Sequence, residues 1–135
     1  MAGQTTIIDA SVGFKWLAEE EGSSLAVHLL EEHMQGQRHL IVPDLFFYEL
    51  LNAVRFKPVD ENIIAHAIAD IGSFQLTHVE VSFRLLDHAA KLALQYGLTI
   101  YDATYLALAE IKDCELITCD KKLLSLKHPL VRSLQ

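Results

Sequence analysis

The chain has 135 residues, of which 51% are hydrophobic, and its formal net charge is −7 at pH 7. This length and composition are typical of one compact globular domain, so we expect residues 1–135 to form a single domain. The acidic balance argues against a protein that coats nucleic acid, because its binding surface would be basic. It does not exclude an enzyme that handles phosphates through metal ions, because clustered carboxylates bind such ions.

Cysteine usage and the N-terminal pattern bear on cellular location. Cys114 and Cys119 are five residues apart, a spacing that matches neither zinc sites nor thioredoxin-type motifs. We therefore expect reduced thiols and a cytoplasmic location, with a structural disulfide as the alternative. Met1 is followed at once by a strand pattern, without a basic leader or a long apolar segment, so neither a secretion signal nor a membrane span is expected.

The first third of the chain predicts two strands separated by two helices. Residues 5–8 are β-branched or apolar and end at Asp9, which indicates a short buried strand. Ser11 is the expected cap of the first helix, and Ser23 begins the second. Residues 39–42 predict the next strand.

The helix expected over residues 44–56 is apolar around most of its circumference, so we expect it to be buried on most sides, yet it contains Glu49. A carboxylate in such a helix is costly unless it is paired, protonated or bound to a cation. Asn52 lies three residues on, hence on the same face. Asp44 and Glu49 are turned about 140° apart on a helix, so both cannot face one site. Asp44 is the natural cap, and we favour Glu49 as the functional acid.

The middle of the chain predicts a helix, a third strand and another helix. A tight connection leads into the first of these helices, and a glycine is the expected stop of the last one. The elements are the connection 57–60, a helix over 63–71, a strand over 76–81, and a helix over 82–96 that ends at Gly97.

The last third repeats one arrangement, in which an apolar run stops at an acid and a helix follows. Residues 98–101 predict a strand that ends at Asp102, although a carboxylate there is also explained as a plain helix cap. Residues 114–118 predict a strand that runs toward Asp120, and residues 121–126 a short helix. The C-terminal tail is expected to add one more short strand.

Alternation of strands and helices predicts a parallel sheet with helices on both faces. Because parallel strands end at one edge, the acids that follow them should gather there. Asp9, Asp102 and Asp120 each follow a predicted strand, and Glu49 lies in the helix after the second strand. Several carboxylates at one edge repel each other unless a divalent cation or altered protonation relieves the repulsion.

This donor set indicates the chemistry of the site. Oxygen ligands without His or Cys favour Mg²⁺ or Mn²⁺ over zinc. Such carboxylate clusters commonly serve phosphodiester hydrolysis, in which metal ions activate water and stabilise the attacking and leaving oxygens. The alternative is that the acids are unrelated helix caps plus one tolerated helix acid.

Four sequence blocks, which together span nearly the whole chain, resemble the PIN-domain family, in particular its small single-domain toxins of the VapC type. Each block is weak alone, but their order and separations are those of the family. The blocks are Ile7-Ile8-Asp9-Ala10-Ser11-Val12, Pro43-Asp44-Leu45-Phe46-Phe47-Tyr48-Glu49-Leu50-Leu51-Asn52-Ala53, Tyr101-Asp102-Ala103-Thr104-Tyr105-Leu106-Ala107-Leu108-Ala109 and Leu116-Ile117-Thr118-Cys119-Asp120-Lys121-Lys122-Leu123.

The resemblance implies a three-layer α/β/α sandwich around a parallel sheet of about five strands. It implies a metal-dependent endoribonuclease that is the toxin of a type II toxin–antitoxin pair, a homodimer, and a small antitoxin that inserts a segment near the active site. It assigns an acidic cluster and supporting polar groups to this chain. The acids are Asp9, Glu49, Asp102 and Asp120, and the supporting residues are Ser11, Asn52 and Thr118.

Two other functions are alternatives to the ribonuclease. A PIN-fold binding or scaffold module without turnover is the main alternative, although the intact acids argue against it. A phospho-accepting receiver-like domain would need an acidic pair after the first strand and an aspartate after the third. Asp9-Ala10 and Val81-Ser82 supply neither.

Several basic residues lie just beyond the acidic blocks and are candidates to contact RNA phosphates. Solvated surface charge is the alternative explanation for each of them. The candidates are Lys15, Arg55, Lys57, Lys121 and Lys122.

Overall fold

The computed structural model describes residues 3–56 and 61–135. The connection predicted over 57–60, together with Lys57, lies outside the described residues. The described elements alternate between strands and helices for most of the chain. They are β1 (Gln4–Ile8), α1 (Ala10–Leu17), α2 (Ser23–Met34), β2 (Arg38–Pro43), α3 (Leu45–Arg55), α4 (Glu61–Ser73), β3 (Thr77–Val79), α5 (Phe83–Tyr96), α6 (Ile100–Lys112), β4 (Glu115–Thr118), α7 (Lys121–Ser125) and β5 (Val131–Ser133).

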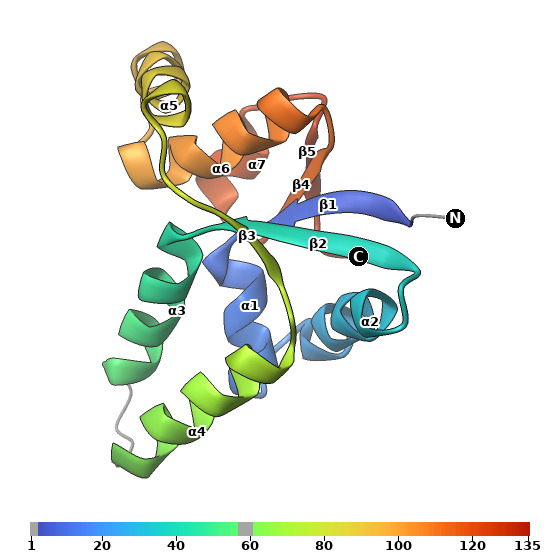
Figure 1. Cartoon of the computed structure of the whole chain (residues 1–135). Coiled ribbons are helices and arrows are strands. Elements are labelled where there is room, and N and C mark those ends of the chain that lie inside the picture. The colour runs from blue at the N-terminus through green and yellow to red at the C-terminus, as the bar shows by residue number, and fades with distance from the viewer. Residues whose placement is uncertain (1–2, 57–60) are drawn as a thin grey trace.

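The strands form one five-stranded sheet in the order β3-β2-β1-β4-β5, and every neighbouring pair is parallel. Helices α1 to α4 lie on one side of the sheet, and α5 and α6 lie on the other (Figure 1). The predicted three-layer α/β/α sandwich is therefore confirmed. The short strand expected in the tail is β5.

Strand β1 occupies the centre of the sheet, and its surroundings fix where a ligand can bind. The chain first adds β2 and β3 on one side of β1 and later adds β4 and β5 on the other. The carboxyl ends of β1 and β4 therefore lie at the point where the strand order reverses. Open α/β sheets bind ligands at this point because the loops diverge there and leave a crevice.

The hydrophobic core lies on both faces of β1 and β2, whose inner residues are buried. Helix α6 is buried along residues 103–109, and contacts β1, β2 and β4. Small side chains such as Ala103 and Ala107 let this helix approach the sheet closely, which explains why its sequence lacks a polar face in that stretch.

The strand predicted over residues 98–101 does not form. Gly97, with φ of 66°, ends α5, and Thr99 caps α6 by accepting a hydrogen bond from the Asp102 amide at 3.1 Å. The apolar run is thus a short corner between two packed helices. Only Leu98 of this run is buried, whereas Ile100 and Tyr101 are exposed. The strand prediction was wrong because a corner with apolar and β-branched residues has the same local pattern as a short buried strand.

The expectation that α3 is buried on most of its circumference was also wrong. One stripe is buried, formed by Phe46, Leu50 and Val54, whereas Tyr48 is 77% exposed. The apolar residues outside the stripe line a surface hollow instead.

Cys114 and Cys119 are free thiols, as expected. In the described part of the chain, no helix is both long enough and apolar enough to span a membrane.

Glu110 of α6 joins three segments on the α5–α6 side of the molecule. Its carboxylate accepts hydrogen bonds from His88 of α5 at 2.8 Å and from His128, which precedes β5, at 2.7 Å. Partial burial alone would raise the pKa of Glu110, but the hydrogen bonds and charges of the two histidines outweigh it and lower the pKa.

We expect Glu110→Gln to reduce the free energy of unfolding by about 1 kcal/mol near pH 6, because solvent screens this half-exposed cluster. A lowered pKa gives stability that is present above the unfolded value and lost as pH falls, so the difference should shrink toward pH 3. Urea unfolding at several pH values measures it. Asp87→Asn, which removes an exposed ion pair with Lys91, is the control and should have little effect.

Candidate active site

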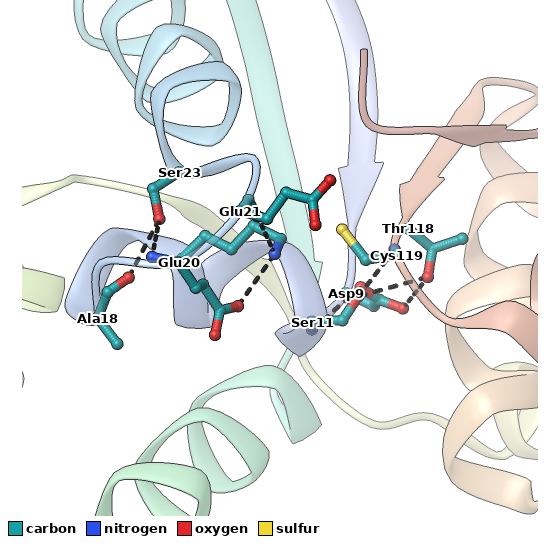
Figure 2. Close-up of polar contacts among 9 residues, drawn as sticks. Asp9, Ser11, Ala18, Glu20, Glu21, Ser23, Thr118 and Cys119 are labelled. Carbon is teal, nitrogen blue, oxygen red and sulfur yellow. Dashed lines mark hydrogen bonds and ion pairs between the residues drawn. The ribbon is translucent and has the colours of Figure 1, made fainter.

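Asp9 lies at the carboxyl end of β1 and is buried, with 5% of its surface exposed. One carboxylate oxygen, Oδ1, accepts hydrogen bonds from the Ser11 amide at 3.1 Å and the Ser11 hydroxyl at 2.5 Å. The other, Oδ2, accepts from the Thr118 hydroxyl at 2.5 Å (Figure 2). Asp9 itself therefore caps α1, and the prediction that Ser11 is the cap was wrong. The carboxylate is the better acceptor for the first amides of the helix.

The two hydroxyls also tie the end of β1 to the loop after β4. Ser11 Oγ accepts a hydrogen bond from the Cys119 amide at 2.9 Å (Figure 2). Thr118 Oγ1 accepts one from the Asp120 amide, also at 2.9 Å. Each hydroxyl therefore donates to Asp9 and accepts from the β4–α7 connection. This network brings Asp120 to the same edge of the sheet as Asp9.

Burial raises the pKa of Asp9 to about 6. Hydrogen bonds from Ser11, Thr118 and the Val12 amide act in the opposite direction, and the negative charge of Asp120 adds to the rise. The hydrogen bonds thus offset only part of the cost of placing this charge in the interior.

Glu49 projects from α3, and its Oε1 accepts a hydrogen bond from the Tyr105 hydroxyl at 2.6 Å. Burial raises the pKa of Glu49, the Tyr105 bond lowers it, and the negative charge of Asp102 raises it again. For Tyr105, burial, the hydrogen bond to Glu49 and the charges of Glu49 and Asp9 all raise the pKa of the phenol above its ordinary value. Tyr105 therefore stays protonated and is a donor.

Asp102 lies in the first turn of α6. Burial raises its pKa first, followed by the charge and the hydrogen bond of Asp120, whereas Lys122 and Thr99 lower it. Asp102 therefore lies close to Asp120, although no strand precedes it. Helix α6 begins at the sheet edge and delivers this acid there.

The four predicted acids are linked in a chain of mutual repulsion. The negative charge of Asp120 raises the pKa of Asp9 and that of Asp102. The charge of Asp102 in turn raises the pKa of Glu49. The donors are all carboxylate oxygens, and their negative charges repel one another. The set therefore suits a hard divalent cation. Among the described residues, no three acidic, His or Cys side chains already converge on one point as a metal site requires.

Two other predicted residues of α3 lie apart from the cluster. Asn52 is exposed, and no hydrogen bond joins it to the four acids in the described part of the chain. Asp44 occupies the N-cap position of α3, as predicted, but its side chain makes no capping hydrogen bond. Its own backbone is already helical, with φ of −51°, which is unlike a usual cap residue.

The basic candidates differ in their surroundings. The Lys15 ammonium pairs with Glu20 Oε1 at 3.0 Å and donates a hydrogen bond to the Glu21 carbonyl, so a phosphate would have to compete with both groups. Arg55 stacks over the Phe56 ring. Lys121 and Lys122 are exposed at the start of α7, and Lys122 acts on Asp102. Lys122 therefore lies close enough to Asp102 for its positive charge to lower the pKa of that acid.

A family model for the PIN domain matches residues 6–129. The chain belongs to the PIN domain family. Ribonuclease VapC3 of Pyrobaculum aerophilum is 30% identical over 122 residues, which cover 87% of this chain and 90% of that protein.

Several solved structures resemble this chain over nearly its whole length. A crystal structure of a Pyrobaculum aerophilum protein is 26% identical with a TM-score of 0.70, covering 97% of this chain and 84% of its own. A toxin–antitoxin complex from Klebsiella pneumoniae contains a chain 15% identical with a TM-score of 0.73, covering 96% and 98%. The second likeness concerns the fold.

The raised pKa of Asp9 predicts the direction in which the free energy of unfolding changes with pH. An acid whose pKa is raised by folding stabilises the protein below its unfolded pKa of 3.8 and loses that contribution as pH rises through about 6. Without divalent cations, wild type should therefore lose about 3 kcal/mol relative to Asp9→Asn between pH 4 and pH 7. Urea unfolding in EDTA measures this difference.

Asp87→Asn is the matched control, since this exposed carboxylate should leave the pH profile parallel to that of wild type. Parallel curves for wild type and Asp9→Asn would contradict the assignment of Asp9 as a strained, buried acid.

Proposed function

We propose that this PIN-domain protein is an endoribonuclease that requires Mg²⁺ or Mn²⁺ and acts as the toxin of a type II toxin–antitoxin pair. The observation that carries the proposal is the chain of four repelling acids at the point where the strand order reverses. The relative called Ribonuclease VapC3 supports RNA as the substrate. We expect the enzyme to act in the cytoplasm.

The chain's own groups have distinct parts in this proposal. Asp9, Glu49, Asp102 and Asp120 would hold the cation, which supplies an activated water and stabilises charge on the phosphate oxygens. Ser11 and Thr118 fix the rotamer of Asp9 through its two oxygens. Lys122 is placed to attract the RNA backbone toward the acids.

Cleavage of RNA should require Mn²⁺ or Mg²⁺ and stop in EDTA. Asp9→Asn and Asp102→Asn should each lower the cleavage rate at least about 100-fold, because they remove a candidate ligand of the cation. Gel analysis of a defined RNA over time measures the rate, and Asp87→Asn should remain fully active.

A growth assay separates toxin from scaffold. Expression of wild type should arrest growth, and Asp102→Asn should not. If wild type neither cleaves RNA nor binds Mn²⁺ in calorimetry, the protein is a PIN-fold binding module and the nuclease proposal fails.

The antitoxin is expected to bind an apolar hollow between α3 and α4. This hollow has a volume of about 580 Å³, and its lining residues Phe47, Tyr48 and Leu51 flank Glu49 in the sequence of α3. We expect an amphipathic segment of the antitoxin to cover its side chains. The apolar lining is Phe47, Tyr48, Leu51, Ile68, Ile71 and Leu76.

The proposed homodimer uses the outer face of α5. Phe83 is 90% exposed and Leu94 is 88% exposed, and helical spacing puts them on one side of the helix. Beside Phe83, an apolar hollow of about 170 Å³ is lined by Val81, Leu86 and Tyr101 among others. A face that carries both a protruding ring and a hollow can pair with a second copy of itself.

Phe83→Glu should convert the dimer to a monomer, because two charges would be buried against each other at a two-fold contact. Light scattering coupled to size exclusion measures the mass. Met34→Glu, at the end of α2 on the other side of the sheet, introduces the same charge and should leave the dimer intact.

A further inference from the structure

Tyr105 is among the largest fully buried side chains of the protein, and it is 1% exposed. It lies on α6 one turn beyond Asp102, so the same helix carries both residues. A phenylalanine would fill the same space without the cost of burying a hydroxyl. The hydroxyl therefore calls for an explanation beyond packing.

The Tyr105 hydroxyl reaches from one layer of the sandwich to the other. Helix α6 lies on one side of the sheet and α3 on the opposite side (Figure 1). At the sheet edge between them, the phenol donates its hydrogen bond to Oε1 of Glu49 at 2.6 Å. The bond uses one lone pair of Oε1, so Oε2 and the second lone pair of Oε1 can serve another partner.

The support of Glu49 differs sharply from that of Asp9. Asp9 is fixed through both oxygens by Ser11 and Thr118. For Glu49, Tyr105 is the hydrogen-bond donor that the described residues provide. Glu49 also has a longer side chain, with one more rotatable bond to be ordered, so its position depends more on a single contact.

We infer that Tyr105 is a positioning residue, whose hydroxyl holds the Glu49 carboxylate at the acidic cluster where the cation binds. This inference rests on the proposed metal-dependent function. Second-sphere hydrogen bonds of this kind orient a ligand before the ion arrives, and the ion then has fewer side-chain torsions to order.

The test compares Mn²⁺ affinity in Tyr105→Phe and wild type by titration calorimetry. Tyr105→Phe retains the ring and removes only the hydroxyl, and should raise the Kd for Mn²⁺ by about 10- to 100-fold. Tyr96→Phe is the matched control. It removes a hydroxyl from α5, where the ring packs against His128 away from the acids, and should leave the Kd unchanged.

Kinetics on RNA give a second measurement that a purely structural defect would not reproduce. In Tyr105→Phe, saturating Mn²⁺ should restore most of kcat, because the hydroxyl affects catalysis only by helping Glu49 to bind the ion. Thermal unfolding of each variant in EDTA verifies that the fold is retained.

The outcomes are distinguishable. If wild type binds Mn²⁺ and Tyr105→Phe binds it equally well, the role of Tyr105 is refuted while the proposed function stands. If Tyr96→Phe weakens binding as much as Tyr105→Phe, the effect is general loosening, and the inference fails. If wild type binds no Mn²⁺, the proposed function itself falls.

Discussion

The burial of one carboxylate, that of Asp9, is the constraint on which the site depends. Its charge is taken out of water at the end of the central strand, and three hydrogen bonds from Ser11 and Thr118 compensate it only in part. The same hydroxyls hold the β4–α7 connection, so Asp120 is brought in by the network that Asp9 requires. Keeping the acids in place lowers the stability of the metal-free protein, as in many sites that bind a charged ligand.

The parallel sheet makes this arrangement possible. The order β3-β2-β1-β4-β5 puts the carboxyl ends of β1 and β4 side by side, where the chain departs to opposite sides. Helices α3 and α6 then approach the same edge from the two outer layers, carrying Glu49 and Asp102 (Figure 1). The acids thus come from four separate segments, and each is fixed by its own element.

Sequence reasoning predicted the strands that carry strong patterns, the parallel architecture, and the segments that bring the four acids near one another. It could do so because hydrophobic periodicity and the edge rule of parallel sheets depend on local pattern alone. It failed at residues 98–101, where a corner between helices has the same apolar composition as a strand. It also misjudged α3, because apolar residues that line a surface hollow look like core residues.

The parts of the site that sequence reasoning missed are side-chain pairings across the fold. Tyr105 looked like one more apolar residue of α6, although its position three residues after Asp102 was a signal. Lys15 looked available for phosphate, but its pairing with Glu20 depends on the turn after α1. Such contacts are set by tertiary distance, which one sequence without relatives does not reveal.

The hydrogen bond between Thr118 and Asp9 joins residues 109 positions apart. Asp9 directly follows β1, whereas Thr118 ends β4. The central acid therefore lacks its fixing hydroxyl until β4 has been synthesised, and long-range contacts of this kind form late. A nascent chain with strands β1 to β3 alone carries Asp9 and Glu49 but has no assembled acidic cluster. The order of synthesis thus delays the appearance of the site until β4 has been added to the sheet.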